Sequence, residues 1–178
     1  MNYKSCIDKF FTLILSFCLC SIFTGCSFSP SDSARERKEI NIMLDSWHNA
    51  AAKADFNTYF NFFNDDAVFI GTDATENWDK KSFMSWAKPH FDKGKTWCFK
   101  PLERHIYVDT SGKIAWFDEL LNTRMKICRG SGVVIKKDNE WKIQQYVLSM
   151  TIPNARTDTV IGLKAPIEDS IINKLLKK

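Results

Sequence analysis

The sequence predicts an α+β domain in which a curled antiparallel sheet surrounds one long helix. Three observations predict this fold class: helical periodicity in the first part of the chain, four long strand-like segments after it, and turn compositions between strands. Helices followed by a run of strands are typical of α+β domains. Four long strands with one apolar face have to curl around an apolar element, and the first helix is the obvious candidate.

The first 25 residues are predicted to be a secretory signal peptide. An apolar run from Phe10 to Phe23 follows the basic residues Lys4 and Lys9. Basic residues before a short apolar run and small residues after it are typical of secretion signals. The run is also shorter than the roughly 20 apolar residues that a helix needs to span a bilayer.

The signal ends in Thr24-Gly25-Cys26, which resembles the lipobox of bacterial lipoproteins. In that family the cysteine is acylated and becomes the first residue of the mature chain. The resemblance implies a lipid anchor at Cys26, in the cell envelope and specifically in the outer membrane of a Gram-negative bacterium. Residues 26–33 are small, polar and interrupted by proline, a composition that suits a flexible tether.

The first helix is predicted over residues 34–54. Ser33 and Glu36 form a capping box, S-x-x-E, which would satisfy backbone N–H groups in the first turn. Apolar residues then recur at spacings of four, three, four and three, which is a single stripe on an α-helix. The stripe consists of Ile40, Leu44, Trp47, Ala51 and Ala54.

Two shorter helices and the strands follow. Asp55 is expected to cap a second helix, and a third begins near Asp79 and should be kinked or ended by Pro89. Strands are predicted at residues 67–70, 95–108, 113–123, 124–137 and 140–151. The domain then covers residues 34–153, and the C-terminal extension 154–178 carries a short amphipathic helix over residues 167–178.

Charge placement argues against nucleic acid as a partner. The whole chain carries +4 and the leader carries +1, which leaves +3 for the mature protein. Nucleic-acid binders concentrate basic residues on one face, whereas the basic residues here lie close to acidic ones. No Gly-rich phosphate loop, nucleophile elbow or HExxH motif occurs, and we predict no cofactor.

Of the six cysteines, only Cys98 and Cys128 lie in the predicted domain. They can pair in an oxidising envelope, or both can be small buried hydrophobes, which is the alternative that we favour. Because no CxxC motif or Cys/His cluster occurs, we predict no metal site.

The last strand reads Trp141-Lys142-Ile143-Gln144-Gln145-Tyr146-Val147-Leu148-Ser149, and further short motifs lie at residues 69–73, 76–78 and 129–134. These motifs and the order of the elements resemble the SnoaL-like branch of the nuclear transport factor 2-like superfamily, over residues 35–153. The resemblance implies a cone, with a curved sheet around a long helix and an open end. Many members bind small apolar molecules in this cone, and some are isomerases, hydrolases or cyclases, so the fold alone does not set the function.

Asp118 is the candidate catalytic residue. Neighbouring side chains of a strand point to opposite faces, so only one of Asp118 and Glu119 can face a cavity. By similarity to relatives, Trp116 and Asp118 are placed inward. Burial among aromatic rings raises the pKa of a carboxyl group, which suits a general acid or base. The alternative is a carboxylate held by an arginine or by backbone groups.

The same alternation places Gln145 and Ser149 in the cavity. Arg129 can neutralise an anionic ligand, pair with Asp118, or lie at the surface. Among the histidines, His90 is the strongest catalytic candidate, although an exposed or hydrogen-bonded histidine is the simpler interpretation. The predicted ligand-binding residues are Trp47, Tyr59, Phe63, Trp78, Trp116, Arg129, Gln145 and Ser149.

The sequence therefore predicts a lipid-anchored envelope protein that binds a small, partly apolar ligand. One alternative is an isomerase, cyclase or hydrolase of a small organic molecule, with Asp118 as general acid or base. Another is a module that pairs with itself or with another envelope protein. In relatives the convex face of the sheet often forms a dimer surface, and Tyr146, Leu148 and Met150 would supply it here.

Overall fold

The structure, a computed structural model, describes residues 30–177, and the side chains from residue 33 onward. The first half contains helix α2 (Pro30–Ala52), helix α3 (Phe56–Asn61), strand β1 (Phe63–Ile70), strand β2 (Asn77–Asp79) and helix α4 (Lys80–Asp92). The second half contains β3 (Lys100–Val108), β4 (Ile114–Thr123), β5 (Lys126–Lys137), β6 (Glu140–Met150), the 3-10 helix η1 (Asn154–Arg156) and α5 (Thr157–Leu176). This order confirms the predicted α+β fold class.

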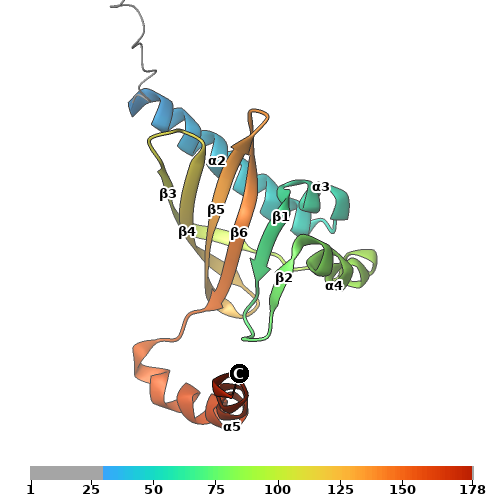
Figure 1. The fold of residues 1–178 in the computed structure, drawn as a ribbon, viewed down its shortest axis with the longest axis vertical. Coiled ribbons are helices and arrows are strands. Elements are labelled where there is room, and N and C mark those ends of the chain that lie inside the picture. Colours follow the sequence, from blue (N-terminus) through green and yellow to red (C-terminus); the bar gives the residue numbers. More distant parts are fainter. Residues whose placement is uncertain (1–29, 178) are drawn as a thin grey trace, which may run out of the picture.

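The six strands form one curved sheet in the order β2-β1-β6-β5-β4-β3. Neighbouring strands are antiparallel except β1 and β6, which run parallel. Helix α2 lies across one face of the sheet, and α3 and α4 lie beside β1 and β2 (Figure 1). The predicted stripe of α2 is buried as far as Ala51, so the long helix supplies the apolar element around which the sheet curls.

The N-terminal boundary of α2 differs from the prediction. The helix begins at Pro30, so residues 30–33, which were assigned to the tether, are helical. Proline suits the first turn of a helix, because the N–H group that it lacks would have no partner there. The capping box is therefore wrong, since Ser33 lies inside the helix. Glu36 instead accepts hydrogen bonds from Lys136 Nζ (2.7 Å) and Trp141 Nε1 (2.8 Å), which ties α2 to the sheet.

A β-bulge in β6 changes which residues face the interior. The register with β5 shifts between Val133 and Val134, which leaves Gln144 without an opposite residue. A bulge adds one residue, and side chains beyond it switch faces relative to simple alternation. The buried side chains of β6 are accordingly Trp141, Ile143, Tyr146 and Leu148. Gln145 and Ser149 are exposed.

Helix α4 closes one side of the open end. The helix begins next to Asp79, near the predicted start. Asp79 is its N-cap, and the Asp79 carboxylate accepts a hydrogen bond from the Ser82 backbone N–H (2.7 Å). The helix continues through Pro89 to Asp92. Its buried face presents Phe83, Ala87 and Phe91. The α4 side chains Trp86 and His90 form part of the site described below.

The C-terminal helix α5 begins ten residues earlier than the predicted helix and passes through Pro166. It lies beyond the end of β6 and apart from the sheet (Figure 1), and none of its described residues is buried. Apolar side chains are exposed along it, namely Ile161, Leu163, Ile167, Ile172, Leu175 and Leu176. Among residues 30–177, no helix combines the length and the apolar composition needed to cross a bilayer.

Candidate ligand-binding site

A cavity of about 740 Å³ lies at the open end of the cone. Its walls come from the end of β1, the β1–β2 loop, α4, the segment before β3, and the β4–β5 turn. Ligand sites are typically clefts of ~300–1,000 Å³ lined mainly by apolar and aromatic side chains. The volume therefore suits a small organic molecule.

Aromatic rings dominate one wall of this cavity. Trp78 and Trp86 stack with ring centroids 5.0 Å apart and planes inclined by 26°. Trp86 also faces Trp97 at 6.1 Å and 29°. Phe83 lies nearly parallel to Trp78, at 5.6 Å and 11°. Phe69 and Phe99 also line the cavity.

Trp86 is 43 % exposed although it is one of the largest apolar side chains in the domain. It lies three residues after Phe83 on α4, a spacing that brings both rings to one side of the helix. A stack of near-parallel rings with one face open to solvent provides a flat apolar surface. A planar ligand can cover that surface and remove it from water.

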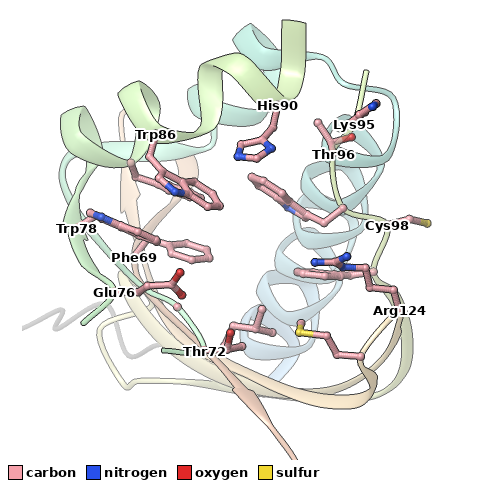
Figure 2. Close-up of a pocket in the computed structure, with 16 residues that line it drawn as sticks. Phe69, Thr72, Glu76, Trp78, Trp86, His90, Lys95, Thr96, Cys98 and Arg124 are labelled. Atoms are coloured by element: carbon pink, nitrogen blue, oxygen red, sulfur yellow. The ribbon is translucent and has the colours of Figure 1, made fainter. Parts of the chain in front are cut away.

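Polar groups reach the cavity from three sides. Figure 2 shows the His90 ring, the Glu76 carboxylate and the Arg124 guanidinium pointing inward. Glu76 also holds the β1–β2 loop, because its Oε2 accepts a hydrogen bond from the Asp73 backbone N–H (3.2 Å). An added Cβ at Gly71 would lie 2.1 Å from that oxygen, so a larger residue there would displace the Glu76 carboxylate.

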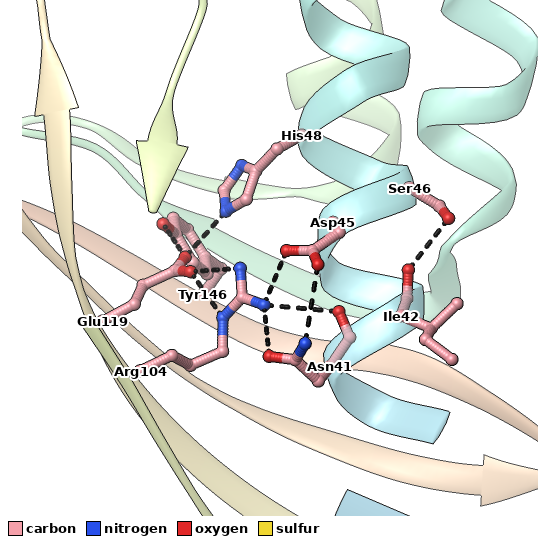
Figure 3. Close-up of polar contacts among 8 residues, drawn as sticks. All are labelled: Asn41, Ile42, Asp45, Ser46, His48, Arg104, Glu119 and Tyr146. Carbon is pink, nitrogen blue, oxygen red and sulfur yellow. Dashed lines mark hydrogen bonds and ion pairs between the residues drawn. The ribbon is translucent and has the colours of Figure 1, made fainter. Parts of the chain in front are cut away.

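A buried polar cluster, none of whose residues lines the cavity, joins four elements (Figure 3). Glu119 Oε1, on β4, accepts hydrogen bonds from His48 Nε2 of α2 (2.8 Å) and from the Tyr146 hydroxyl of β6 (3.0 Å). Glu119 Oε2 accepts a hydrogen bond from Arg104 Nε of β3 (2.9 Å) and pairs with its Nη2 (2.8 Å). Arg104 Nη1 also contacts Asp45 and Asn41 of α2.

Burial raises the pKa of Glu119, but the hydrogen bond and charge of His48 and the charge of Arg104 outweigh it and leave this pKa below its usual value. Burial and the neighbouring Glu119 charge raise the pKa of Tyr146 well above its usual value. Glu119 is thus an ionised carboxylate with both oxygens engaged, and Tyr146 is a protonated donor. This arrangement braces the sheet against α2 rather than leaving a free acid or base.

The predicted inward orientation of Trp116 and Asp118 is wrong. Trp116 is 50 % exposed and stacks on Tyr107 on the outer face of the sheet, with centroids 5.9 Å apart. Asp118 is part exposed and contacts His105 Nδ1 (3.2 Å). Glu119 is the inward acid, because α2 and β3 bring His48 and Arg104 to that side. A carboxylate held by an arginine was the alternative considered for Asp118, but in the structure it is Glu119 that Arg104 holds.

The bulge in β6 explains a second group of misplaced residues. Gln145 and Ser149 face outward, whereas simple alternation placed them in the cavity. Tyr146 and Leu148, predicted for the convex face, are buried, and only Met150 of that set is exposed. Arg129 pairs with Ser149 in the β5–β6 register and is likewise exposed.

Among the remaining predicted ligand-binding residues, Trp47, Tyr59 and Phe63 are buried in the core and do not line the cavity, whereas Trp78 does. His90, noted in the sequence, also lines it. Sequence reasoning did not assign Trp86, Trp97 or Arg124 to the site. The placement of Trp86 and His90 one turn apart on α4 was the available signal.

The cysteines of the domain are both free: Cys98 is exposed and Cys128 is buried. The expectation of two buried cysteines is therefore wrong for Cys98, which lies on the segment before β3. Within residues 30–177, no group of three or more potential metal-ligating side chains gathers. Cys26 lies outside the described residues.

A family model described as "SnoaL-like domain" matches residues 40–153, which is more than half of the chain. No curated protein matches the sequence. Among solved structures, a candidate scytalone dehydratase from Novosphingobium aromaticivorans superposes with a TM-score of 0.59 at 12% identity, covering 70% of this chain and 89% of that one.

An NTF2-like protein of unknown function from Pseudomonas putida superposes with a TM-score of 0.57 at 13% identity, covering 68% of this chain and 91% of that one. A protein of unknown function with a cystatin-like fold from Nostoc punctiforme gives a TM-score of 0.53 at 14% identity, covering 65% of this chain and 90% of that one. At these identities the neighbours establish the fold.

Proposed function

The chain belongs to the SnoaL-like domain family, and from that premise we propose that it binds a small, partly apolar ligand in the aromatic cavity. The observation that carries the proposal is the open stack of Trp78, Trp86 and Trp97 around a space of about 740 Å³. Such a surface is costly to leave in water, at about 25 cal/mol per Å² of apolar area. A planar ligand recovers this free energy and adds ring stacking.

A calorimetric titration with naphthalene-2-methanol, a neutral planar probe, tests this proposal. Trp86→Ala should weaken binding at least about tenfold, equivalent to about 1.4 kcal/mol, because it removes the centre of the stack. Trp116→Ala is the matched control, since this similarly exposed tryptophan lies on the outer face of the sheet. The affinity of this variant for the probe should stay within about twofold of the wild-type value. No binding by the wild type, or equal losses in the two variants, would contradict the proposal.

The enzymatic alternative requires Asp118 to face the cavity as general acid or base, and the structure places it elsewhere. Asp118 lies on the outer face beside His105 and does not line the cavity. Glu119 is inward, but its two oxygens already accept three hydrogen bonds and form an ion pair with Arg104 Nη2. The cavity offers His90 and the Glu76 carboxylate as titratable groups. Glu76 already accepts a hydrogen bond from the Asp73 backbone N–H, and these two groups alone do not define a reaction. Binding without turnover is therefore the proposal that the geometry favours.

Pairing of two copies is a second candidate function, favoured by the outer face of the sheet. Ile114, Trp116 and Tyr107 are each 46–50 % exposed there and form an apolar area across β3 and β4. Sedimentation of the wild type should show a dimer, and Trp116→Glu should convert it to a monomer by placing a charge in the interface. A monomeric wild type would exclude this candidate.

We also propose that Cys26 carries a lipid anchor in the outer membrane of a Gram-negative envelope. The support is the signal-like leader and the Thr24-Gly25-Cys26 sequence. Because α2 begins at Pro30, the described start of the domain lies four residues after this cysteine. Cys26→Ala should move the protein from the membrane fraction to the soluble envelope fraction, and unchanged partitioning would refute acylation.

A further inference from the structure

We propose that Arg124 selects an anionic ligand, so that the cavity prefers a planar aromatic carboxylate to the neutral molecule of the same shape. This inference rests on the proposed function, because it concerns the same cavity. It adds to that proposal the chemical class of the ligand.

The first observation is the position of the guanidinium. Arg124 lies on the β4–β5 turn, and its head group points into the cavity (Figure 2). Within the part of the chain that the structure describes, it forms no ion pair or hydrogen bond, whereas Arg104 is paired with Glu119 and Asp45. A guanidinium remains charged at any physiological pH and matches a carboxylate with two parallel hydrogen bonds.

The second observation is that the turn carrying Arg124 is held in one conformation. The Thr123 hydroxyl donates to the Lys126 carbonyl (3.0 Å) and accepts from the Met125 backbone N–H (2.9 Å). Thr123 is itself buried, and Lys126 adopts the positive φ of 69° that closes the turn. An arginine on a braced turn loses less conformational freedom on binding than one on a mobile loop.

The third observation is the balance of charge around the cavity. Among the described residues that line the cavity, Lys95 and Arg124 are basic and Glu76 is the one acidic residue. Glu76 lies on the wall opposite Arg124 (Figure 2) and holds the Asp73 backbone N–H. No carboxylate within residues 33–177 therefore neutralises this arginine, and a ligand carboxylate would take that place.

These positions define how an aromatic acid would lie. Its ring would cover Trp86 and the adjoining tryptophans, and its carboxylate would point across the cavity to Arg124. Hydrogen bonds to charged groups contribute more than neutral ones, but Arg124 is itself exposed, and solvent screens part of the attraction. A preference of about tenfold for the acid is thus the expected size of the effect.

The experiment compares naphthalene-2-carboxylate with naphthalene-2-methanol at pH 7 by calorimetry. The wild type should bind the carboxylate about tenfold more tightly than the alcohol, and raising the salt concentration should reduce this ratio. Arg124→Gln should bring the ratio close to one, because it weakens binding of the carboxylate far more than binding of the alcohol. Arg124→Lys, which keeps the charge and loses the planar fork, should give an intermediate ratio.

Arg129→Gln is the matched control. Arg129 is also an exposed arginine, it lies on the neighbouring strand β5, and it does not line the cavity. It should preserve the preference for the acid. Urea unfolding of each variant checks that the fold is intact, as expected for exposed side chains.

The outcomes separate the two proposals. If the wild type binds both probes equally, or if Arg124→Gln keeps the full preference for the acid, the inference about Arg124 is overturned while the proposed function stands. The inference about Arg124 would also be overturned if Lys95→Gln lost the preference for the acid while Arg124→Gln kept it. If the wild type binds neither probe, the proposed function fails first.

Discussion

Replacing Glu119 by glutamine should destabilise the domain strongly, whereas replacing its neighbour Asp118 by asparagine should not. Both substitutions exchange one carboxylate oxygen for an amide nitrogen at adjacent positions of β4. The side chain of Glu119 is 0% exposed and holds His48 and Arg104, which are themselves 4% and 5% exposed. Asp118 is 34% exposed and contacts a His105 that is 48% exposed.

The expected magnitudes follow from these environments. Removing one partner of a buried ion pair typically costs about 3–5 kcal/mol, because the other charge is left buried and unpaired. Arg104 retains Asp45, which places Glu119→Gln near the lower end, at about 3 kcal/mol. An exposed pair contributes about 0–1 kcal/mol, so Asp118→Asn should change the free energy of unfolding by less than about 1 kcal/mol.

The pH dependence has a definite sign. The pKa of Glu119 is lowered in the folded protein from the ordinary value of 4.5. Between the folded and unfolded pKa values the unfolded chain binds more protons, so stability rises with pH. The stabilisation is fully present above pH 4.5 and is lost as the pH falls through the folded pKa. The difference between wild type and Glu119→Gln should therefore be constant near neutrality and shrink in acid.

Urea unfolding, monitored by tryptophan fluorescence at pH 7 and at successively lower pH, measures the free energies of unfolding of the wild type, Glu119→Gln and Asp118→Asn. Because Trp47 packs against Tyr146 with ring centroids 4.7 Å apart, its emission reports on the region of the cluster. Equal losses in Glu119→Gln and Asp118→Asn, or a larger loss in Asp118→Asn, would refute the assignment of the two faces of β4.

Two other predictions concern packing and exposure. Gly130→Ala should destabilise the domain by about 1–3 kcal/mol, because the added Cβ would lie 2.1 Å from the Tyr146 hydroxyl. Gly162→Ala, with nothing within 4 Å, should leave the same urea midpoint unchanged, and a matching loss there would argue against the steric explanation. Cys98 should react with a thiol reagent in the native protein, and Cys128 should react only after unfolding. Mass spectrometry of the labelled protein measures both reactions, and rapid labelling of Cys128 in the native protein would contradict its burial in β5.

Local patterns predicted the elements of this protein. The apolar stripe from Ile40 to Ala51 marked α2, and the turn residues 109–112 and 137–139 separated the long strands, because periodicity and turn chemistry act over a few neighbouring residues. Their order was sufficient to predict a sheet curled around a helix. The N-cap Asp55 and the start of a helix near Asp79 were equally local predictions, and both hold in the structure.

Contacts between distant segments decided the rest. Alternation showed that Asp118 and Glu119 lie on opposite faces, but which one is inward depended on His48 and Arg104, which come from other elements. Strand sequence alone did not reveal the extra residue at Gln144, so every later side chain of β6 was placed on the wrong face.

The cavity is also a product of the tertiary structure. Its walls bring together residues 69–78 of β1 and β2, the α4 side chains Trp86 and His90, Trp97 before β3, and Arg124 between β4 and β5. The sequence by itself determined that these aromatic and basic groups exist and on which elements they lie. Only the closure of the sheet, driven by burial of the apolar face around α2, decided that they meet around one space.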